Sequence, residues 1–209
     1  TDGRRAKVIF GRDFKADALR RDFTFNALSV SADGSVYDET GGLDDIKTKH
    51  VRFIGDPATR IREDYLRILR YFRFHAAFAE GQADAAALAA IGDNRAGLQG
   101  LSRERVCAEL MKLLATEQAA ETLSLMSGLG LLPDLLAGVP CLTRLSAMPR
   151  DADPLLKLAA LTLLKTEDAA RLQESLRLSN AQTQRLLHGA RVLAHFHGAP
   201  VPDIQNLRE

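Results

Sequence analysis

The chain has 209 residues, of which 46% are hydrophobic and 26% are charged, and its formal net charge is +1. This composition excludes an intrinsically disordered protein, and no apolar run approaches the ~18 residues that a membrane-spanning helix needs. The two cysteines, Cys107 and Cys141, lack metal-like spacing. Because the polar opening segment also does not resemble a secretory signal, we expect free thiols and a cytoplasmic location rather than a disulfide.

The charge is distributed unevenly along the chain. Residues 1–78 hold fifteen Lys and Arg against twelve Asp and Glu, which gives a balance of +3. Residues 79–209 hold thirteen against fifteen, which gives a balance of −2. A mildly basic first part suits an anionic ligand but does not by itself establish one.

Short β-strands are predicted in the first sixty residues. Segments rich in β-branched and aromatic residues cover 7–10, 23–30, 35–38 and 51–55. Turn signals separate them at Asp33-Gly34, Gly41-Gly42 and Asp56-Pro57. Four short strands with at most one helix would leave one face of a sheet uncovered. We therefore expect that an upstream part is missing or that a partner completes the sheet.

After residue 60 the pattern becomes helical. The predicted helices cover 61–79, 84–91, 103–115, 117–127, 154–164, 167–176 and 180–197. Ser102 and Ser179 are candidate N-caps, and Gly128 is a candidate helix terminator. The two parts together predict an α+β fold, in which a small strand-rich region is followed by an all-α region.

The segment "REDYLRILRYFRF" (62–74) places three arginines after an aspartate at intervals of three: Asp64, Arg67, Arg70 and Arg73. On a helix, the apolar residues of this segment form one stripe suited to a core, and the arginines follow a slow spiral on the other face. Asp64 and Arg67 are one turn apart, so both side chains can point at one object. This register predicts a shared binding role for the pair.

A solvated helix face with an i,i+3 ion pair is the alternative interpretation of these arginines, and such a pair contributes only about a few tenths of a kcal/mol. Two features weigh against it. Leu66 and Phe74 lie within the arginine arc, so this face is not simply exposed to solvent. In addition, arginine rather than lysine supplies planar donors that match bases and phosphates.

An Asp–Arg pair has the chemistry to read a nucleobase. An ionised carboxylate only accepts hydrogen bonds, and a guanidinium only donates them. Cytosine and adenine each present an amino donor beside a ring-nitrogen acceptor, whereas uracil and guanine reverse this order. One such pair could therefore accept C and A and reject U and G, while further arginines remain for a triphosphate.

A second segment, "ALRRDFTFNAL" (18–28), has a compatible composition. Arg20, Arg21 and Asp22 precede a predicted strand, where loop residues often contact ligands. The alternative is an exposed loop with local ion pairs. Seen alone, this segment does not decide between the two interpretations.

Together these segments resemble the class II nucleotidyltransferases, namely bacterial CCA-adding enzymes and bacterial poly(A) polymerases. "RRDFTFNAL" (20–28) is similar to the RRDFT-x-NA motif, and "REDYLRILRYFRF" is similar to the E-D-x-x-R motif that serves as a protein template for C and A. "DGSVYDETGGLDDIKTKHVRFIG" (33–55) resembles the flexible element between head and neck, and "LSRERVCAELMKLL" (101–114) resembles the following neck segment. The resemblance covers about residues 1–127.

The resemblance assigns a role to each matching residue. Asp64 and Arg67 would read the base, and Arg21 would contact the nucleotide from the first motif. Arg70 and Arg73 would support the nucleotide and its phosphates. The supporting residues would be Arg20, Asp22, Asn26 and Glu63. Among them, Glu63 would position the template helix, and Asp22 and Asn26 would organise their motif, with a direct ribose contact as the lesser alternative.

One family motif has no counterpart in this sequence. The glycine-rich phosphate loop followed by a metal-binding D-x-D pair does not occur, so the resemblance implies that the metal carboxylates lie upstream of Thr1. We therefore expect a fragment that holds no catalytic residue and no metal ligand and is itself inactive. The complete protein would use Mg2+ to transfer nucleotides from CTP and ATP by two-metal phosphoryl transfer.

The later helices match no motif that the family resemblance supplies. Arginines at 171, 177, 185 and 191 could contact RNA phosphate, although ordinary helix surface is the simpler interpretation. Histidines at 188, 195 and 197 only weakly suggest a metal, and solvated or capping histidines explain them better.

The overall prediction is a partial nucleotidyltransferase head over 1–60, a helical neck with the template helix over 61–130, and a helical RNA-binding body and tail over 131–209. The implied activity of the complete protein is CTP/ATP:tRNA nucleotidyl transfer that builds the 3′-CCA end of tRNA, with the tRNA 3′ end as partner and no membrane. Poly(A) polymerase, a CC-adding or A-adding enzyme, and a non-catalytic RNA-binding helical module remain alternatives.

Overall fold

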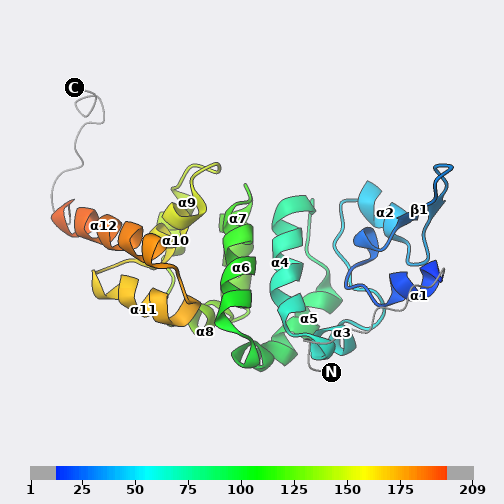
Figure 1. The fold of residues 1–209 in the computed structure, drawn as a ribbon, viewed down its shortest axis with the longest axis horizontal. Coiled ribbons are helices and arrows are strands. Elements are labelled where there is room, and N and C mark those ends of the chain that lie inside the picture. Colours follow the sequence, from blue (N-terminus) through cyan, green and yellow to red (C-terminus); the bar gives the residue numbers. More distant parts are fainter. Residues whose placement is uncertain (1–12, 197–209) are drawn as a thin grey trace.

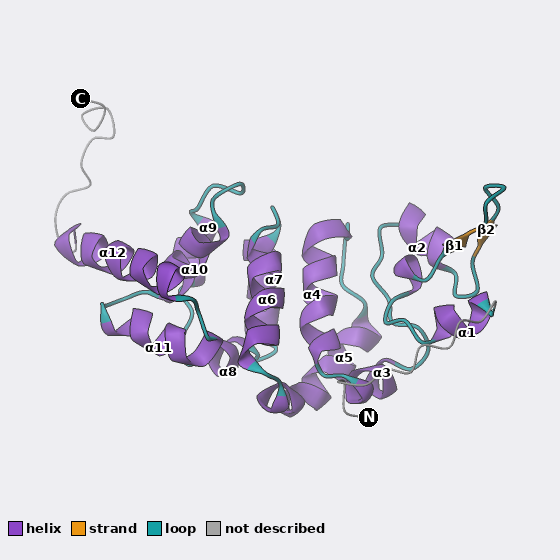
Figure 2. Cartoon of the chain, in the orientation of Figure 1, coloured by secondary structure: helices purple, strands orange, loops and turns teal. Residues whose placement is uncertain are grey.

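The computed structural model describes residues 13–196, and the side chains of residues 13–192. Its elements form an elongated row that follows the sequence, from the strands at one end, through α4 and α6 in the middle, to α12 at the other end (Figure 1). Helices dominate, and a two-stranded sheet is confined to the N-terminal end (Figure 2). The described part therefore confirms the predicted α+β fold.

The N-terminal region contains four regular elements and one short 3-10 helix. They are α1 (Phe14–Leu19), the 3-10 helix Thr24–Asn26, β1 (Ser29–Val30), β2 (Val36–Tyr37) and α2 (Gly42–Lys47). The strands β1 and β2 pair antiparallel, with Ser29 opposite Tyr37. A single antiparallel bridge joins Phe23 to Phe53.

The helical region runs from α3 to α12, with a 3-10 helix over Arg95–Gly100. Its helices are α3 (Pro57–Glu63), α4 (Leu66–Phe78), α5 (Ala85–Asn94), α6 (Arg103–Leu114), α7 (Ala119–Gly128), α8 (Leu132–Leu136), α9 (Leu142–Ser146), α10 (Pro154–Thr162), α11 (Glu167–Leu176) and α12 (Asn180–Phe196). The predicted caps are confirmed, because Ser102 Oγ accepts from the Arg105 N–H and Ser179 Oγ accepts from the Gln182 N–H. Helix α7 ends at Gly128 as predicted, although the residue with positive φ is Gly130.

Most of the predicted strand content is wrong. The segment 23–30 forms a strand only at its last two residues, and 51–55 forms no strand beyond the bridge at Phe53. The predicted strand over 7–10 lies outside the described residues. In the two-stranded sheet that does form, Val30 is 66% exposed and Val36 is 49% exposed.

Helix α2 was not predicted, and the chemistry of its start explains it. The carboxylate of Asp38 accepts hydrogen bonds from the N–H groups of Thr40, Gly42 and Leu43. A Cβ at Gly42 would come 2.3 Å from the Thr24 carbonyl oxygen, so only glycine fits at this position. The Gly41-Gly42 pair, which was predicted to form a turn, is therefore the tightly packed start of α2.

The predicted helix over 61–79 is two helices, because α3 ends at Glu63 and α4 begins at Leu66. Asp64 between them is extended, with φ −155° and ψ 107°, and its Oδ1 accepts from the Leu66 N–H at 3.0 Å. Aspartate commonly competes with helix continuation in this way. The ring of Tyr65 lies against Gly97, which leaves no room for a Cβ there.

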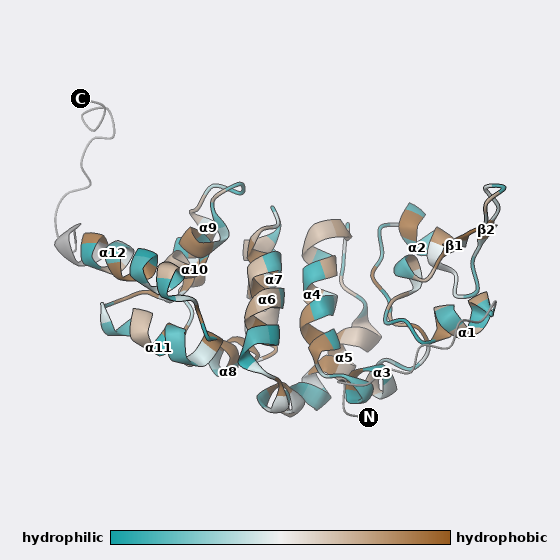
Figure 3. Cartoon of the chain, in the orientation of Figure 1, coloured by the Kyte–Doolittle hydropathy of each residue, from teal (hydrophilic) through white to brown (hydrophobic). Residues whose placement is uncertain are grey.

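A small buried cluster of Ala18, Ala27 and Ile54 accompanies the main core, a large buried cluster that extends from Phe23 to Ala190. Its N-terminal end is aromatic, with Phe23, Phe53 and Tyr71 in mutual contact. Along the remaining helices it is dominated by leucine. Hydrophobic and hydrophilic residues alternate along the helices, as expected where each helix buries one face (Figure 3). Among the described residues no helix is long and apolar enough to span a bilayer.

Candidate functional site

A pocket of about 350 Å³ opens where the segment after α1 meets the α3–α4 junction and the first turn of α6. It is lined by Arg20, Arg21, Asp22, Asn26, Asp64, Leu66, Arg67, Arg70 and Arg105. All the predicted site residues except Glu63 and Arg73 therefore come together in one place. Five arginines face two aspartates there, so the pocket is strongly basic and suits an anionic ligand.

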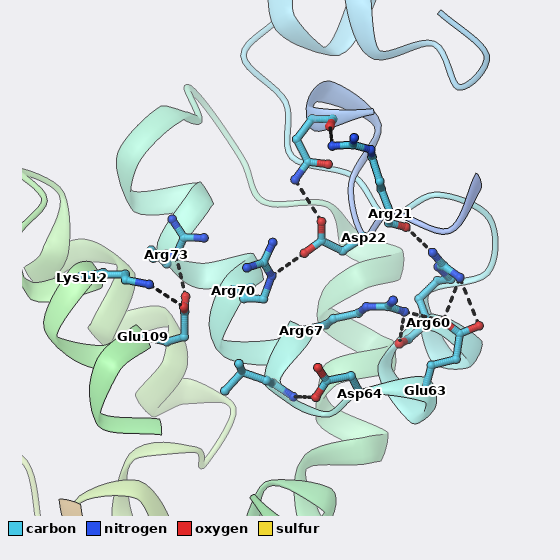
Figure 4. Close-up of polar contacts among 12 residues, drawn as sticks. Arg21, Asp22, Arg60, Glu63, Asp64, Arg67, Arg70, Arg73, Glu109 and Lys112 are labelled. Carbon is cyan, nitrogen blue, oxygen red and sulfur yellow. Dashed lines mark hydrogen bonds and ion pairs between the residues drawn. The ribbon is translucent and has the colours of Figure 1, made fainter. Parts of the chain in front are cut away.

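Asp22 organises the wall of this pocket. It is 7% exposed, and its carboxylate accepts from Asn26 Nδ2 at 2.9 Å and from Arg70 Nε at 2.5 Å. Burial by itself would raise the pKa of Asp22, but the hydrogen bonds from Arg70 and Asn26 outweigh it and hold this pKa below its usual value. Because Asp22 joins residues 48 apart in sequence, it fixes the head segment to α4 (Figure 4).

Arg20 and Arg21 stand at the mouth of the pocket and are partly exposed. Both bind the carboxylate of Asp17, one turn earlier on α1, and these bonds lower the pKa of Asp17. Arg21 also donates to the carbonyl oxygen of Asn26 at 3.2 Å. The Oδ1 atom of Asn26 is buried and has no hydrogen-bond partner among the described residues. The mouth therefore offers the remaining guanidinium donors of Arg20 and Arg21, whereas the acceptor on Asn26 is buried.

Asp64 is held at the base of the pocket by two bonds. Its Oδ1 accepts from the Leu66 N–H, and its Oδ2 accepts from Arg105 Nη2 at 2.7 Å. Its side chain remains 36% exposed, so part of the carboxylate faces the pocket. The backbone N–H of Arg67 donates to the Asp64 carbonyl oxygen at 3.0 Å, but no bond between their side chains is found among the described residues, so the two side chains share the pocket without pairing.

Arg67 is fixed by α3 rather than by Asp64. Its Nη1 donates to the Arg60 carbonyl oxygen at 2.8 Å and to Glu63 Oε2 at 2.5 Å. Glu63 also binds Arg60 Nη1, and Arg67 is the first cause of its lowered pKa. These bonds use only the Nη1 donors of Arg67, which has five N–H groups. Glu63 therefore orients Arg67 from outside the pocket (Figure 4).

Arg73 does not line the pocket. Its Nε donates to Glu109 Oε2 at 2.6 Å, and its guanidinium carbon lies 3.8 Å from the centre of the Phe74 ring. Glu109 on α6 is 5% exposed and also binds Lys112 at 3.1 Å. The expected phosphate contact of Arg73 thus has no support in its surroundings, which place it at the junction of α4 and α6 (Figure 4).

Three residues of this region were not singled out from the sequence. Arg105 binds Asp64, Glu109 binds Arg73, and Arg60 binds the carbonyl oxygens of Leu19 and Arg21. Arg105 and Glu109 are one turn apart on α6, in the segment that resembles the family's neck motif. The sequence signal available for Arg105 and Glu109 was their spacing after the Ser102 cap. Their partners are distant in sequence, 41 residues from Arg105 and 36 residues from Glu109.

Among the arginines of the C-terminal helices, Arg171 and Arg177 line a separate pocket of about 350 Å³ together with Arg103. Arg171 donates to the Ala137 carbonyl oxygen and binds Asp168, and Arg185 binds Asp153. Arg177 ends α11 with a φ of 53°. His197 and the side chain of His195 lie outside the described residues. Among the described residues, no group of three or more His, Cys, Asp and Glu is placed to hold a metal.

Comparisons with known proteins match both ends of the pocket. Residues 1–52 match the family described as "Poly A polymerase head domain", and this matched range includes Arg20 to Asn26. Residues 84–144 match the family described as "Probable RNA and SrmB- binding site of polymerase A", and this matched range includes Arg105. Two family models of one kind of polymerase therefore match in the expected order.

Relatives and solved structures agree with this result. The chain is 47% identical over 133 residues to "CCA tRNA nucleotidyltransferase 1, mitochondrial" of Danio rerio, covering 63% of this chain and 31% of that protein. It is 35% identical to the CCA-adding enzyme of Streptococcus gordonii, over 80% of this chain and 44% of that enzyme. The structure of Bacillus stearothermophilus CCA-adding enzyme in complex with CTP matches with a TM-score of 0.71 and 30% identity.

The chain belongs to the family of CCA-adding enzymes and bacterial poly(A) polymerases. The Bacillus stearothermophilus match covers 89% of this chain and 48% of that structure. The chain spans about a third of the length of the curated relatives it matches first, at 31%, 32% and 31%. The family resemblance derived from motifs is thus confirmed.

Proposed function

We propose that this chain supplies the nucleotide-selecting part of a CTP/ATP:tRNA nucleotidyltransferase that builds the 3′-CCA end. In that reaction the RNA 3′-hydroxyl oxygen bonds to the α-phosphate of the incoming nucleotide, and pyrophosphate leaves. The observation that carries the proposal is the pocket itself. It brings together Asp64, Arg67 and Arg70 from one segment, Arg21 from another, and Arg105 from a third.

Each part of the pocket suits one part of a nucleoside triphosphate. The open side of the Asp64 carboxylate can accept from the amino group of cytosine or adenine, and the remaining donors of Arg67 can reach the ring nitrogen. Arg70 and Arg21 provide charge for the phosphates.

Two fixed carboxylates keep these arginines in place before a nucleotide arrives. Asp22 holds Arg70, and Glu63 holds Arg67. A site whose donors are already oriented loses less conformational freedom when it binds. Arg105 has the same effect on Asp64, because it fixes the carboxylate by its Oδ2 and leaves the exposed side toward the pocket.

The family resemblance implies Mg2+, which would activate the RNA hydroxyl and neutralise the leaving pyrophosphate. The described residues hold no carboxylate cluster that fits this ion, so we assign no step to it here. Because the glycine-rich loop with its D-x-D pair does not occur in this sequence, we expect the 209-residue chain alone to be inactive. The cytoplasmic location remains a prediction, and three of the related proteins are named as mitochondrial.

A product-length assay tests the proposal. The natural gene product containing these residues would be incubated with tRNA lacking its 3′ end, CTP and ATP, with the 209-residue chain as a comparison. We expect the gene product to add C, C and A and then to stop. A long adenosine tail would identify a poly(A) polymerase, and RNA binding without incorporation would identify a non-catalytic module.

A further inference from the structure

A second cavity, of about 480 Å³, lies in the helical part of the chain, remote from the pocket that contains Asp64. It is formed by the start of α7, by α9 and by the loop before α10, and none of its residues line the first pocket. The side chains important here are Ser124, Leu142, Leu145, Met148 and Lys157. Nothing in the proposed nucleotidyl transfer uses this cavity.

Lys157 is the unusual residue of this cavity. It is 3% exposed, and its Nζ donates to the carbonyl oxygens of Thr116 at 2.9 Å and Arg150 at 2.5 Å. No carboxylate lies within ion-pair distance of it in the described part of the chain. An ammonium has three donors, so one N–H remains. A buried charge without an opposite charge is unfavourable, and a bound anion would compensate it.

The start of α7 adds further donors at the same wall. Ala119 and Ala120 form its first turn and line the cavity. The first N–H groups of a helix have no acceptor within the helix and carry partial positive charge. The preceding residue, Gln118, does not cap them with its side chain. Lys157 and this helix start therefore present donors to one space.

The rest of the lining limits what kind of anion fits. Leu142, Leu145 and Met148 form an apolar wall, which suits an organic body rather than a bare ion. Two carboxylates also line the cavity: Glu121 is paired with Arg150 at 3.0 Å, and Glu117 is exposed to solvent. Lys157 is therefore the only buried charged residue of the lining.

We infer that this cavity binds a small organic phosphate, with its oxygens at Lys157 and the start of α7 and its apolar body on Leu142, Leu145 and Met148. A free phosphate ester and a phosphate of an RNA chain share this chemistry. The inference does not depend on the proposed nucleotidyl transfer, because the two pockets share no residue.

The test is an NMR titration of the 209-residue chain, in which the backbone amides of Ala119 and Ala120 are followed while phenyl phosphate is added. We expect saturating shifts of these amides, and none with phenol, which lacks the anion. Absence of saturating shifts with phenyl phosphate would overturn the inference. A short RNA without terminal phosphates then separates the sources: displacement of phenyl phosphate assigns the site to RNA backbone phosphate, and no displacement assigns it to a free ester.

Matched variants locate the binding. Ser124→Asp places a negative charge in the cavity, whereas Ser127→Asp places one on the same helix outside the lining. We expect the first to weaken phenyl phosphate binding about tenfold or more and the second to leave it nearly unchanged. Lys157→Met should abolish binding, and the serine pair decides the result if that variant does not fold. Equal effects of the two serine variants would contradict the assignment.

Discussion

Arginines on successive turns of α4 have different surroundings, although they follow one spacing. Arg67 and Arg70 face an open pocket and are oriented by carboxylates at its edge. Arg73, one turn later, is 18% exposed and bound to the buried Glu109 of α6. The comparison shows that the neighbouring helix, rather than the interval of three, decides whether an arginine is available to a ligand.

The largest effect on stability should come from removing the buried partner of Arg73 at the α4–α6 junction. Glu109→Ala leaves the guanidinium of Arg73 buried without its partner, so we expect a loss of about 2–4 kcal/mol in the free energy of unfolding. Urea denaturation of the 209-residue chain measures it. Lys112→Ala is the control, because Lys112 is 59% exposed and should cost little. An unchanged free energy of unfolding in Glu109→Ala would mean that the contact between Arg73 and Glu109 does not stabilise this junction.

Asp22, in the wall of the pocket, should contribute less than Glu109 to the free energy of unfolding, and its contribution should depend on pH. Its pKa is lower in the folded state, so its contribution is complete above the unfolded pKa of about 3.9 and is lost as the pH falls through the folded value. Asp22→Asn should cost about 1–3 kcal/mol at neutral pH. Its unfolding free energy should also fall less than that of the wild type below about pH 4. Parallel pH profiles would contradict the role of Asp22.

Arg70→Ala and Arg73→Ala compare directly an arginine that lines the pocket with one that does not. In the complete gene product, Arg70→Ala should weaken binding of CTP and ATP alike by about 1–3 kcal/mol, since it removes a charge-assisted contact. Arg73→Ala should mainly lower stability. Binding of each nucleotide by fluorescence titration and melting of each variant measure the two effects. Equal losses of nucleotide affinity would return Arg73 to the phosphate role expected from the sequence.

Arg105→Met should have the smallest effect on stability. The Arg105–Asp64 ion pair is half exposed, and such pairs contribute about 0–1 kcal/mol. Discrimination between CTP and UTP should nevertheless fall, because Asp64 loses the group that orients it. Arg103→Met on the same turn is the matched control. An unchanged CTP/UTP ratio would show that Asp64 needs no support from α6.

The sequence predicted most of the longer helices, because their caps and periodicity are local, but it missed α8, α9 and the break between α3 and α4. Ser102, Ser179 and the boundaries of α11 follow from neighbouring residues. The head was predicted poorly because its short segments are held by distant contacts. Gly42 packs against Thr24, and Asp45 binds Thr24 and Arg52, so apolar alternation was a weak guide there.

The candidate site also has a part that local motifs predicted and a part that distant packing determines. Motif residues identified most of the pocket, including Arg21, Asp64, Arg67 and Arg70. The Asp64 break in the helix, the shift of Arg73 to Glu109 and the support from Arg105 depend on where α6 packs. No spacing within one segment carries that information.

The central claim is that Asp64 selects the base, although it also caps α4. Incorporation of all four nucleotides by wild type and Asp64→Ala gene product tests it, with thermal stability measured alongside. Asp56→Ala is the control, because Asp56 caps α3 through the Thr59 N–H at 2.7 Å and does not line the pocket. Both variants should lose about 1 kcal/mol of stability. Only Asp64→Ala should lose discrimination against UTP, by about 10- to 100-fold. An unchanged base preference in Asp64→Ala, with the same loss of stability as Asp56→Ala, would contradict the account.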